Sequence, residues 1–345
     1  MLCKKISALI CFLVTLLLYQ MISVATVPAF AQPEPPTLKF VSPKHASLLE
    51  ELVQKHGFDI DFLRPLFEAI VIRPDIIEKL DRPAEKMPYY DYKKRFLEEK
   101  LIARGILYFQ ENRLLLTQVE ADYDVPKEII AAILGIETRF GEPGIEKYRA
   151  WDVYNTGYVL YPRREAFFKA ELIAFLTLCK EEGLDPLSIK SSYAGAMGVP
   201  QFMPSSFLKF AMDGDGDQKR NLWSSKTDIY ASVANYFKAS GWRMGGIVRL
   251  PVKISGNPMD AQKTMEAGIR ETVTVARAEG IGIEFPNAVG KEELVSFASY
   301  KPEEGKDLFV ALFNNFRVII SYNASVNYAM VVTELSEMLA TPKGN

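Results

Sequence analysis

One carboxylate of this chain stands where an acid–base catalyst would be placed, on the apolar face of an expected helix. Ile130, Ile133 and Leu134 precede Glu137 by seven, four and three positions, so at 3.6 residues per turn the four side chains share one stripe. A carboxyl group among apolar side chains loses hydration, which raises its pKa toward the range of a general acid. A glutamate at the edge of the stripe, with its head in water, would show the same spacing, so this segment leaves both interpretations open.

The ends of this helix also have local signals. We expect Asp124 as the N-cap, Pro126 in the first turn and Gly141 as the stop. The helix that carries Glu137 is therefore predicted by its termini as well as by its periodicity.

A second cluster has the spacing of a cation-binding loop. Alternate aspartates can direct oxygen ligands around a hard cation, as in the first half of an EF-hand loop. The loop departs from that pattern because Gln218 stands where a glycine makes the sharp turn and Ser224 stands where a bidentate glutamate belongs. The sequence predicts a structural calcium site, with a solvated acidic turn as the alternative. The expected ligands are Asp213, Asp215, Asp217, the carbonyl of Lys219, and Asp228 from the next helix.

Three further segments could bind a ligand but are ambiguous alone. Residues 192–204 are rich in small and turn-forming residues, which allow either close approach of a ligand or tight helix packing. Residues 161–164 open a helix with a tyrosine and two arginines. Residues 321–328 place polar aromatic side chains before the last expected helix.

The first 31 residues have the pattern of a secretory signal peptide. Lys4 and Lys5 precede an apolar run that ends near position 27, and Ala29-Phe30-Ala31 is a small-x-small cleavage site. We therefore expect an exported, periplasmic protein of 314 residues, with an uncleaved membrane anchor as the alternative. Cys11 follows Ile10 inside the apolar run, so a lipoprotein is not expected.

The composition of the mature chain excludes several classes of function. It has 39 basic and 43 acidic side chains, so its charge of −4 provides no general attraction to nucleic acid or anionic membrane. Its one cysteine, Cys179, lies in an apolar periodic segment and reads as a buried structural thiol. The two histidines, His45 and His56, lie far from the other motifs. A Ser-His-Asp triad, a Cys-His pair and a histidine-ligated zinc site are therefore not expected.

The pattern of elements indicates a mainly helical protein with a small β-containing part, of class α+β. An apolar run at 316–320 is expected to form a strand, before a last helix from about 325 to 339. The expected organisation is a signal peptide at 1–31, a Pro-rich tether at 32–43, an N-terminal helical region at 44–123, a catalytic core with the Asp-rich loop at 124–246, a β-containing subdomain at 247–315, and a strand and helix at 316–345 that return to the core.

Six segments occur together and in one order: 135–141 around Glu137, 161–164, 194–206, the Asp-rich loop through Trp223, 232–237, and 315–330. In this order they resemble the lytic murein transglycosylase B family, glycoside hydrolase family 103, across nearly all of the mature chain. The resemblance implies a lysozyme-like helical core that acts on peptidoglycan glycan strands. It also implies that Glu137 is the single catalytic acid/base and that the Asp-rich loop is a calcium site.

The residues that match positions lining that family's glycan cleft are Arg163, Ser192, Gln201, Tyr236, Tyr322, Asn323 and Tyr328. The chain departs from the family at Phe140, where tryptophan is frequent, and at residues 151–157, where a more aliphatic run is found, so we expect one wall of the cleft to differ. The implied reaction cleaves the bond between N-acetylmuramic acid and N-acetylglucosamine and leaves a 1,6-anhydromuramoyl end. A hydrolytic lysozyme and a non-catalytic peptidoglycan-binding module are the alternatives. Proteins of cell-wall synthesis or remodelling are expected as partners, without a sequence feature that names one.

Overall fold

The computed structural model describes residues 42–81, 87–255 and 259–341. The expected signal peptide and its cleavage site lie outside these residues, as does most of the expected tether. Ser42 and Pro43, placed in the tether, are instead the N-cap and first residue of helix α2 (Pro43–Gln54). In the described ranges, no helix has both the length and the apolar composition needed to cross a membrane.

The region before Glu137 is a series of helices, as expected. They are α2, α3 (Ile60–Glu68), α4 (Pro74–Leu80), α5 (Tyr89–Tyr92), the 3-10 helix η2 (Lys93–Arg95), α6 (Glu99–Glu111) and α7 (Arg113–Tyr123). The charged segment from 91 to 120 is not one continuous helix, because it is interrupted at residues 96–98 and again at Asn112. At the second break the Asn112 side chain donates a hydrogen bond to the carbonyl of Tyr108 and accepts one from Lys226. A side chain that bonds the backbone in this way competes with helix continuation.

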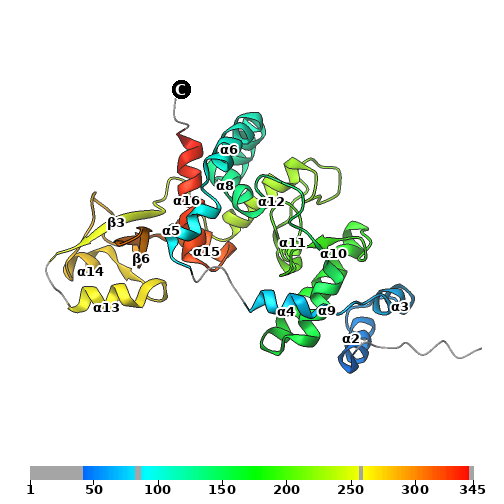
Figure 1. Cartoon of the computed structure of the whole chain (residues 1–345). Helices are drawn as coiled ribbons and strands as arrows, with labels where there is room; N and C mark the ends of the chain where they lie inside the picture. Colours follow the sequence, from blue (N-terminus) through cyan, green and yellow to red (C-terminus); the bar gives the residue numbers. More distant parts are fainter. Residues whose placement is uncertain (1–41, 82–86, 256–258, 342–345) are drawn as a thin grey trace, which may run out of the picture. The chain divides into compact units, whose positions relative to one another are not determined.

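The next six helices or helical turns surround the expected site. They are α8 (Lys127–Thr138), α9 (Ala150–Leu160), the 3-10 helix η3 (Pro162–Arg164), α10 (Glu165–Glu182), α11 (Pro204–Phe210) and α12 (Lys226–Ala239), with a small ladder between β1 (Tyr148–Arg149) and β2 (Lys190–Ser191). Helix α8 packs against α6, α7, α12 and α16 (Val326–Ala340), so it is covered from several sides. Figure 1 shows α16, in red, beside α6 and α8.

The N-cap predicted for α8 was wrong, because the predicted residue belongs to the end of the preceding helix. Asp124 does not cap α8: it has a left-handed backbone conformation (φ 56°, ψ 40°) and ends α7. Pro126 is the N-cap residue of α8. Only residues 124–126 separate α7 from α8, and Asp124 is the C-cap of α7. At the other end, Arg139, Phe140 and Gly141 all have positive φ, so the helix ends at Thr138, three residues before the expected glycine.

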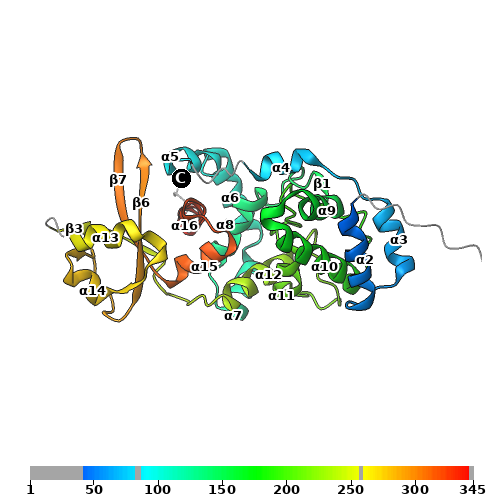
Figure 2. The same ribbon diagram turned by 90° about the horizontal axis from the view of Figure 1, so that it is seen from below.

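The β-containing part is a five-stranded antiparallel sheet with two short helices. Its strands have the order β4-β6-β7-β3-β5. The elements in chain order are β3 (Arg249–Ile254), α13 (Met259–Ala267), the 3-10 helix η4 (Gly268–Arg270), β4 (Val273–Thr274), α14 (Val275–Gly280), β5 (Ile283–Glu284), β6 (Leu294–Glu303) and β7 (Lys306–Leu312). Figure 2 shows α13 and α14 beside the sheet, and their apolar side chains share one core with Phe297 and Val252.

The strand predicted at 316–320 was also wrong, because this segment lies in helix α15 (Asn314–Tyr322). A short apolar run does not distinguish a strand from a buried helix, and here tertiary contacts decide. The Asn315 side chain accepts a hydrogen bond from the backbone N–H of Arg243 and donates to the carbonyls of Arg243 and Gly246. These bonds attach the start of α15 to the turn after α12. The predicted last helix is confirmed as α16.

Close packing between α9 and α10 depends on Gly157. A Cβ atom at this position would lie 2.3 Å from Cγ of the buried Phe168 ring. Gly157→Ala is expected to cost about 1–3 kcal/mol of stability through overpacking and to lower the melting temperature. Gly280→Ala in α14, where a Cβ would meet no atom within 4 Å, is the matched control and should leave the melting temperature nearly unchanged. Equal melting temperatures for the two variants would contradict this packing.

Candidate active site

Glu137 lies one residue before the end of α8, among residues that are almost all buried. Its side chain is partly exposed, and its Oε1 atom accepts a 2.6 Å hydrogen bond from the hydroxyl of the buried Tyr328 in α16. Burial raises the pKa of Glu137 to about 7, although the Tyr328 hydrogen bond acts in the opposite direction. A carboxyl group with this pKa can be protonated at neutral pH and can also take a proton back.

Two tyrosines near Glu137 stay protonated and can donate hydrogen bonds. Burial, and then the charge of Glu137, raise the pKa values of Tyr322 and Tyr328 well above that of an ordinary phenol. The Tyr322 hydroxyl donates to the carbonyl of Pro200. The Tyr328 bond therefore brings the start of α16 to the carboxylate of α8, and the Tyr322 bond joins the end of α15 to Pro200.

Tyr236 joins the same cluster through its ring. Its ring centroid lies 4.8 Å from that of Tyr322 and 4.5 Å from that of Phe210, and its hydroxyl donates to the carbonyl of Ser321. Tyr236 is buried, so in this arrangement it supports Tyr322 and holds the end of α15.

The segment that contains Ser192 and Gln201 forms a compact turn beside Thr138, the neighbour of Glu137. The Thr138 hydroxyl lies 3.1 Å from the carbonyl of Val199. The Ser192 hydroxyl accepts a hydrogen bond from the N–H of Ala196, and the Gln201 amide donates to the carbonyl of Gly198. Both polar residues are partly exposed.

The glycines of this segment serve close packing, which was one of the two interpretations left open. A Cβ at Gly195 would lie 2.5 Å from the ring of Tyr154, and one at Gly198 would lie 2.8 Å from the carbonyl oxygen of Leu222. Phe140 has a comparable role, since its ring packs against Gly105. It is buried, so its own ring does not line a cleft, and the expected difference in one cleft wall stays a prediction.

Arg163 and Asn323 are less closely tied to Glu137. The exposed Arg163 guanidinium pairs with Asp81 and lies 5.1 Å from the ring centroid of Tyr161. Asn323 is the residue after α15, has an extended backbone and is partly exposed. The described contacts do not join Arg163 to Glu137, and the glycan-binding roles of both residues stay predictions.

Glu146 was not predicted as part of the site. Its Oε1 atom accepts a 2.6 Å hydrogen bond from the backbone N–H of Gly198, in the turn beside Thr138. The residue lies in the loop between α8 and β1, which has no periodic pattern. A sequence signal for its position is therefore lacking.

The thiol of Cys179 is excluded as a nucleophile. Its side chain is 1% exposed, and burial raises its pKa to about 12. The thiolate is the reactive form, so this cysteine is inert near neutral pH. The prediction of a buried structural thiol is confirmed.

The Asp-rich loop brings three of the five predicted metal ligands together. One carboxylate oxygen from each of Asp213, Asp215 and Asp217 lies within 4.8 Å of the others. Asp213 also accepts hydrogen bonds from the backbone N–H groups of Gly216 and Gln218. Gln218 adopts φ 68°, the conformation that a glycine would have in the related loop. Clustered carboxylate oxygens are the donors that calcium prefers, so these residues fit the ion.

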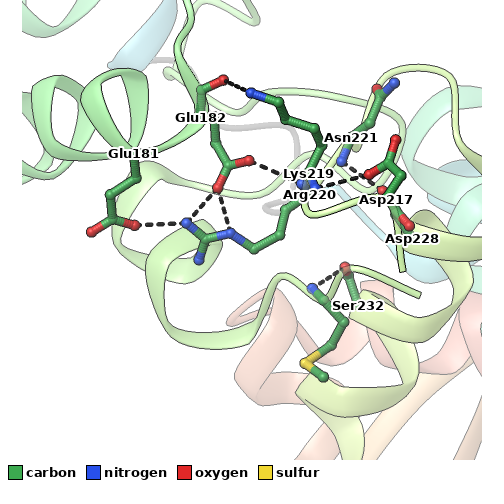
Figure 3. Close-up of polar contacts among 9 residues, drawn as sticks. Glu181, Glu182, Asp217, Lys219, Arg220, Asn221, Asp228 and Ser232 are labelled. Atoms are coloured by element: carbon green, nitrogen blue, oxygen red, sulfur yellow. Dashed lines mark hydrogen bonds and ion pairs between the residues drawn. The ribbon is translucent and has the colours of Figure 1, made fainter. Parts of the chain in front are cut away.

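Asp228 and Lys219 have other contacts in this structure. Asp228 is buried, and its two oxygens accept hydrogen bonds from the N–H groups of Gly214 and Asn221, which closes the loop at both ends. The Lys219 ammonium donates to the carbonyl of Glu182. Figure 3 shows the contacts of Asp228 with Asn221 and of Lys219 with Glu182, beside the Arg220 pairs with Glu181 and Glu182. Asp228 lies outside the group of three carboxylates, so its role as a ligand stays a prediction.

Comparison with known proteins decides the family. The family model described as "Transglycosylase SLT domain" matches residues 41–337 of this chain. The chain belongs to this family. It is 32% identical over 309 residues to the membrane-bound lytic murein transglycosylase B of Escherichia coli, with 87% of this chain and 83% of that protein covered. The chain is thus an enzyme of the lytic murein transglycosylase family, which acts on peptidoglycan.

Solved structures of the family have the same fold. Catenated lytic transglycosylase SltB1 from Pseudomonas aeruginosa has a TM-score of 0.82 at 36% identity, with 88% of this chain and 99% of that chain covered. E. coli Slt35, solved in complex with calcium, has a TM-score of 0.80 at 30% identity and coverages of 90% and 98%. The more distant SltB3 from P. aeruginosa, solved with NAG-anhNAM-pentapeptide, has a TM-score of 0.74 at 26% identity and coverages of 86% and 79%. The mainly helical, lysozyme-like fold expected from the sequence is confirmed.

Burial of Glu137 predicts a pH-dependent gain of stability on its replacement. The rise of its pKa from 4.5 to about 7 means that the folded state loses about 3 kcal/mol, relative to the unfolded state, as the pH rises through this interval. Glu137→Gln does not titrate, so it should melt higher than the wild type at pH 8 and close to it at pH 4. Thermal denaturation at both values tests this. A difference that does not grow with pH would show that the carboxylate is not disfavoured in the folded protein.

Proposed function

We propose that this enzyme cleaves the β-1,4 bond between N-acetylmuramic acid and N-acetylglucosamine and forms 1,6-anhydromuramoyl ends, with Glu137 as the single acid/base. The observation that carries the proposal is the Glu137 carboxyl group, whose pKa is raised by burial to about 7 and whose Oε1 atom is held by Tyr328. Most glycosidases use two carboxylates, so a mechanism with one needs another source of the nucleophile.

The substrate supplies that nucleophile. Protonated Glu137 gives its proton to the glycosidic oxygen as the bond to the anomeric carbon of the muramoyl residue breaks. The acetamido group of that residue stabilises the positive charge at the anomeric carbon. Glu137, now a carboxylate, takes the proton from the muramoyl 6-hydroxyl as its oxygen attacks that carbon. The proton balance closes and no water is consumed.

The surrounding residues support both stages of this reaction. The Tyr328 hydroxyl holds Oε1, whereas Oε2 has no hydrogen-bond partner among the described residues and is therefore available to the substrate. The hydrogen bond from Tyr328 also stabilises the Glu137 carboxylate that forms after proton transfer. Tyr322 and Asn323 would hold the sugar ring and its acetamido group, a positioning role.

We extend the glycan-binding assignment to Ser192, Gln201, Tyr236 and Arg163 from the family resemblance. Ser192 and Gln201 are partly exposed on the turn beside Thr138, which supports a direct role. Tyr236 is buried, so its contribution would act through Tyr322. The SltB3 complex with NAG-anhNAM-pentapeptide supports an anhydro product for this chain.

Two alternatives predict different outcomes. A hydrolytic lysozyme would use the same acid but admit water to the anomeric carbon, so its products would carry reducing ends. A peptidoglycan-binding module would not need a carboxyl group whose pKa is raised to about 7, which disfavours that reading.

We also propose a cellular location and classes of partner for this enzyme. The N-terminal pattern supports a cleaved signal peptide and a periplasmic location without a lipid anchor, where peptidoglycan strands would be the substrate. The charge of the mature chain provides no reason to expect nucleic acid as a partner. Cell-wall synthesis or remodelling proteins are the proposed class of protein partner.

We propose calcium as a structural ion of the Asp-rich loop. The three clustered carboxylates support this role, as does the presence of calcium in the Slt35 structure. Asp228 anchors the loop to the start of α12, the helix that carries Tyr236. The ion would therefore support the site through the fold, without contact with the reaction.

Product analysis tests the proposed reaction. Mass spectrometry of digests of purified peptidoglycan should find muropeptides with anhydro ends, each one water lighter than the hydrolysed form. Glu137→Gln should reduce cleavage by about 10²–10⁴-fold because its amide has no proton to give. Its fold, checked by circular dichroism, should be retained. Mainly reducing muramic acid ends would assign the enzyme as a lysozyme instead.

Calcium should raise the melting temperature of the wild type. An ion that binds the folded state alone contributes about 2.7 kcal/mol at a hundredfold excess over its Kd. The gain should be much smaller for the double variant Asp215→Ala, Asp217→Ala, which removes two of the three clustered carboxylates. Magnesium at equal concentration is the control. A melting temperature that a chelator leaves unchanged, or equal protection by magnesium, would contradict a calcium site.

A further inference from the structure

We propose that Glu146 is a positioning residue for cleavage, which holds the turn at residues 198–201 against the end of α8. The inference rests on the proposed function, because it takes Glu137 as the acid/base of the reaction. The turn contacts Thr138, the residue that follows Glu137. Glu146 itself is not placed in contact with the substrate.

The backbone polar groups of this turn are satisfied from four directions. The Gly198 carbonyl accepts from the backbone and side chain of Gln201. The Val199 N–H donates to the carbonyl of Leu222 at 2.8 Å, and the Val199 carbonyl accepts from Thr138. The Pro200 carbonyl accepts from Tyr322. The remaining donor, the N–H of Gly198, is bound by Glu146 at 2.6 Å.

The partner of the Gly198 N–H is difficult to replace. Gly198 has φ 69°, and its α-carbon is so close to Leu222 that a Cβ would lie 2.8 Å from the Leu222 carbonyl oxygen. The backbone therefore has little room to rotate toward another acceptor. Burial raises the pKa of Glu146, whereas the N–H groups of Gly198 and of the side chain of Trp223, the residue after Leu222, lower it by favouring the carboxylate. One carboxylate thus joins the turn to the segment on which it packs.

The turn determines the surroundings of Glu137 through two bonds. Thr138 follows Glu137 directly, and its hydroxyl also accepts from the N–H of Gly141, so a shift of Val199 would change the end of α8. Tyr322, whose pKa responds to the charge of Glu137, is bound to Pro200. Movement of the turn would therefore displace groups on both sides of the catalytic carboxyl. A displacement near 1 Å can reduce the rate of an enzyme by about a hundredfold.

The experiment compares three substitutions with a matched control. Glu146→Ala removes the acceptor, Glu146→Asp withdraws it by one methylene group, and Glu146→Gln keeps an acceptor oxygen without the charge. Glu142→Ala is the control, because Glu142 lies in the same loop but is exposed and pairs with Arg104. We measure kcat and KM on purified glycan strands well below the melting temperature of each variant.

Glu146→Ala is expected to lower kcat by about tenfold to a hundredfold, with KM changed by less than about threefold. Glu146→Gln should restore most of kcat, and Glu142→Ala should match the wild type. If Glu146→Ala does not fold, Glu146→Asp should show the loss of kcat in a folded protein. A merely structural role would lower the melting temperature and leave kcat unchanged. That result, or a Gln variant as slow as the Ala variant, would overturn the inference.

Failure of this inference is distinguishable from failure of the proposed function. If the wild type forms anhydro products and Glu137→Gln does not, the function holds whatever the Glu146 variants do. A wild-type kcat in Glu146→Ala would then exclude the positioning role alone.

Discussion

The chemistry of this structure depends on one partly exposed carboxyl group, held near the end of an apolar, covered helix. Helix α8 is covered by α6, α7, α12 and α16, and its residues are buried almost without interruption up to Glu137. Such a position disfavours the charged form of Glu137, and the hydroxyl of Tyr328 limits the cost by donating to Oε1. The same packing that stabilises the fold therefore sets the protonation state on which the proposed chemistry relies.

The elements around α8 hold the groups that face this carboxyl. Helices α15 and α16 bring Tyr322 and Tyr328 from a part of the chain almost two hundred residues away, and hydrogen bonds of Asn315 attach α15 to the turn after α12. On the other side, the turn at 198–201 is bound to Thr138 and Glu146. The site is thus assembled from segments that are distant in sequence, and each one is held by hydrogen bonds to backbone groups.

Local sequence signals succeeded where one interaction dominates. The apolar stripe that ends at Glu137, the apolar periodicity around Cys179 and the last helix α16 all depend on burial of apolar side chains, and the structure has all three, with α8 buried beyond the expected stripe. The strand expected at 316–320 failed because a short apolar run fits both a strand and a buried helix. The N-cap expected at Asp124 was wrong because this residue ends the preceding helix α7. A local cap signal does not show how far the preceding helix extends.

The sequence by itself determined the helix that carries Glu137, the apolar stripe that leads up to this residue and the alternation of aspartates in the loop, because each follows from spacing within one segment. Only the tertiary structure decided that Tyr328 donates to Glu137, that Asp228 binds the two ends of the loop through backbone N–H groups, and that Glu146 holds Gly198. These contacts join segments that have no periodic relation to each other. Their partners are fixed by how the helices pack, and a hydrogen bond across such a distance leaves no pattern in the sequence of either segment.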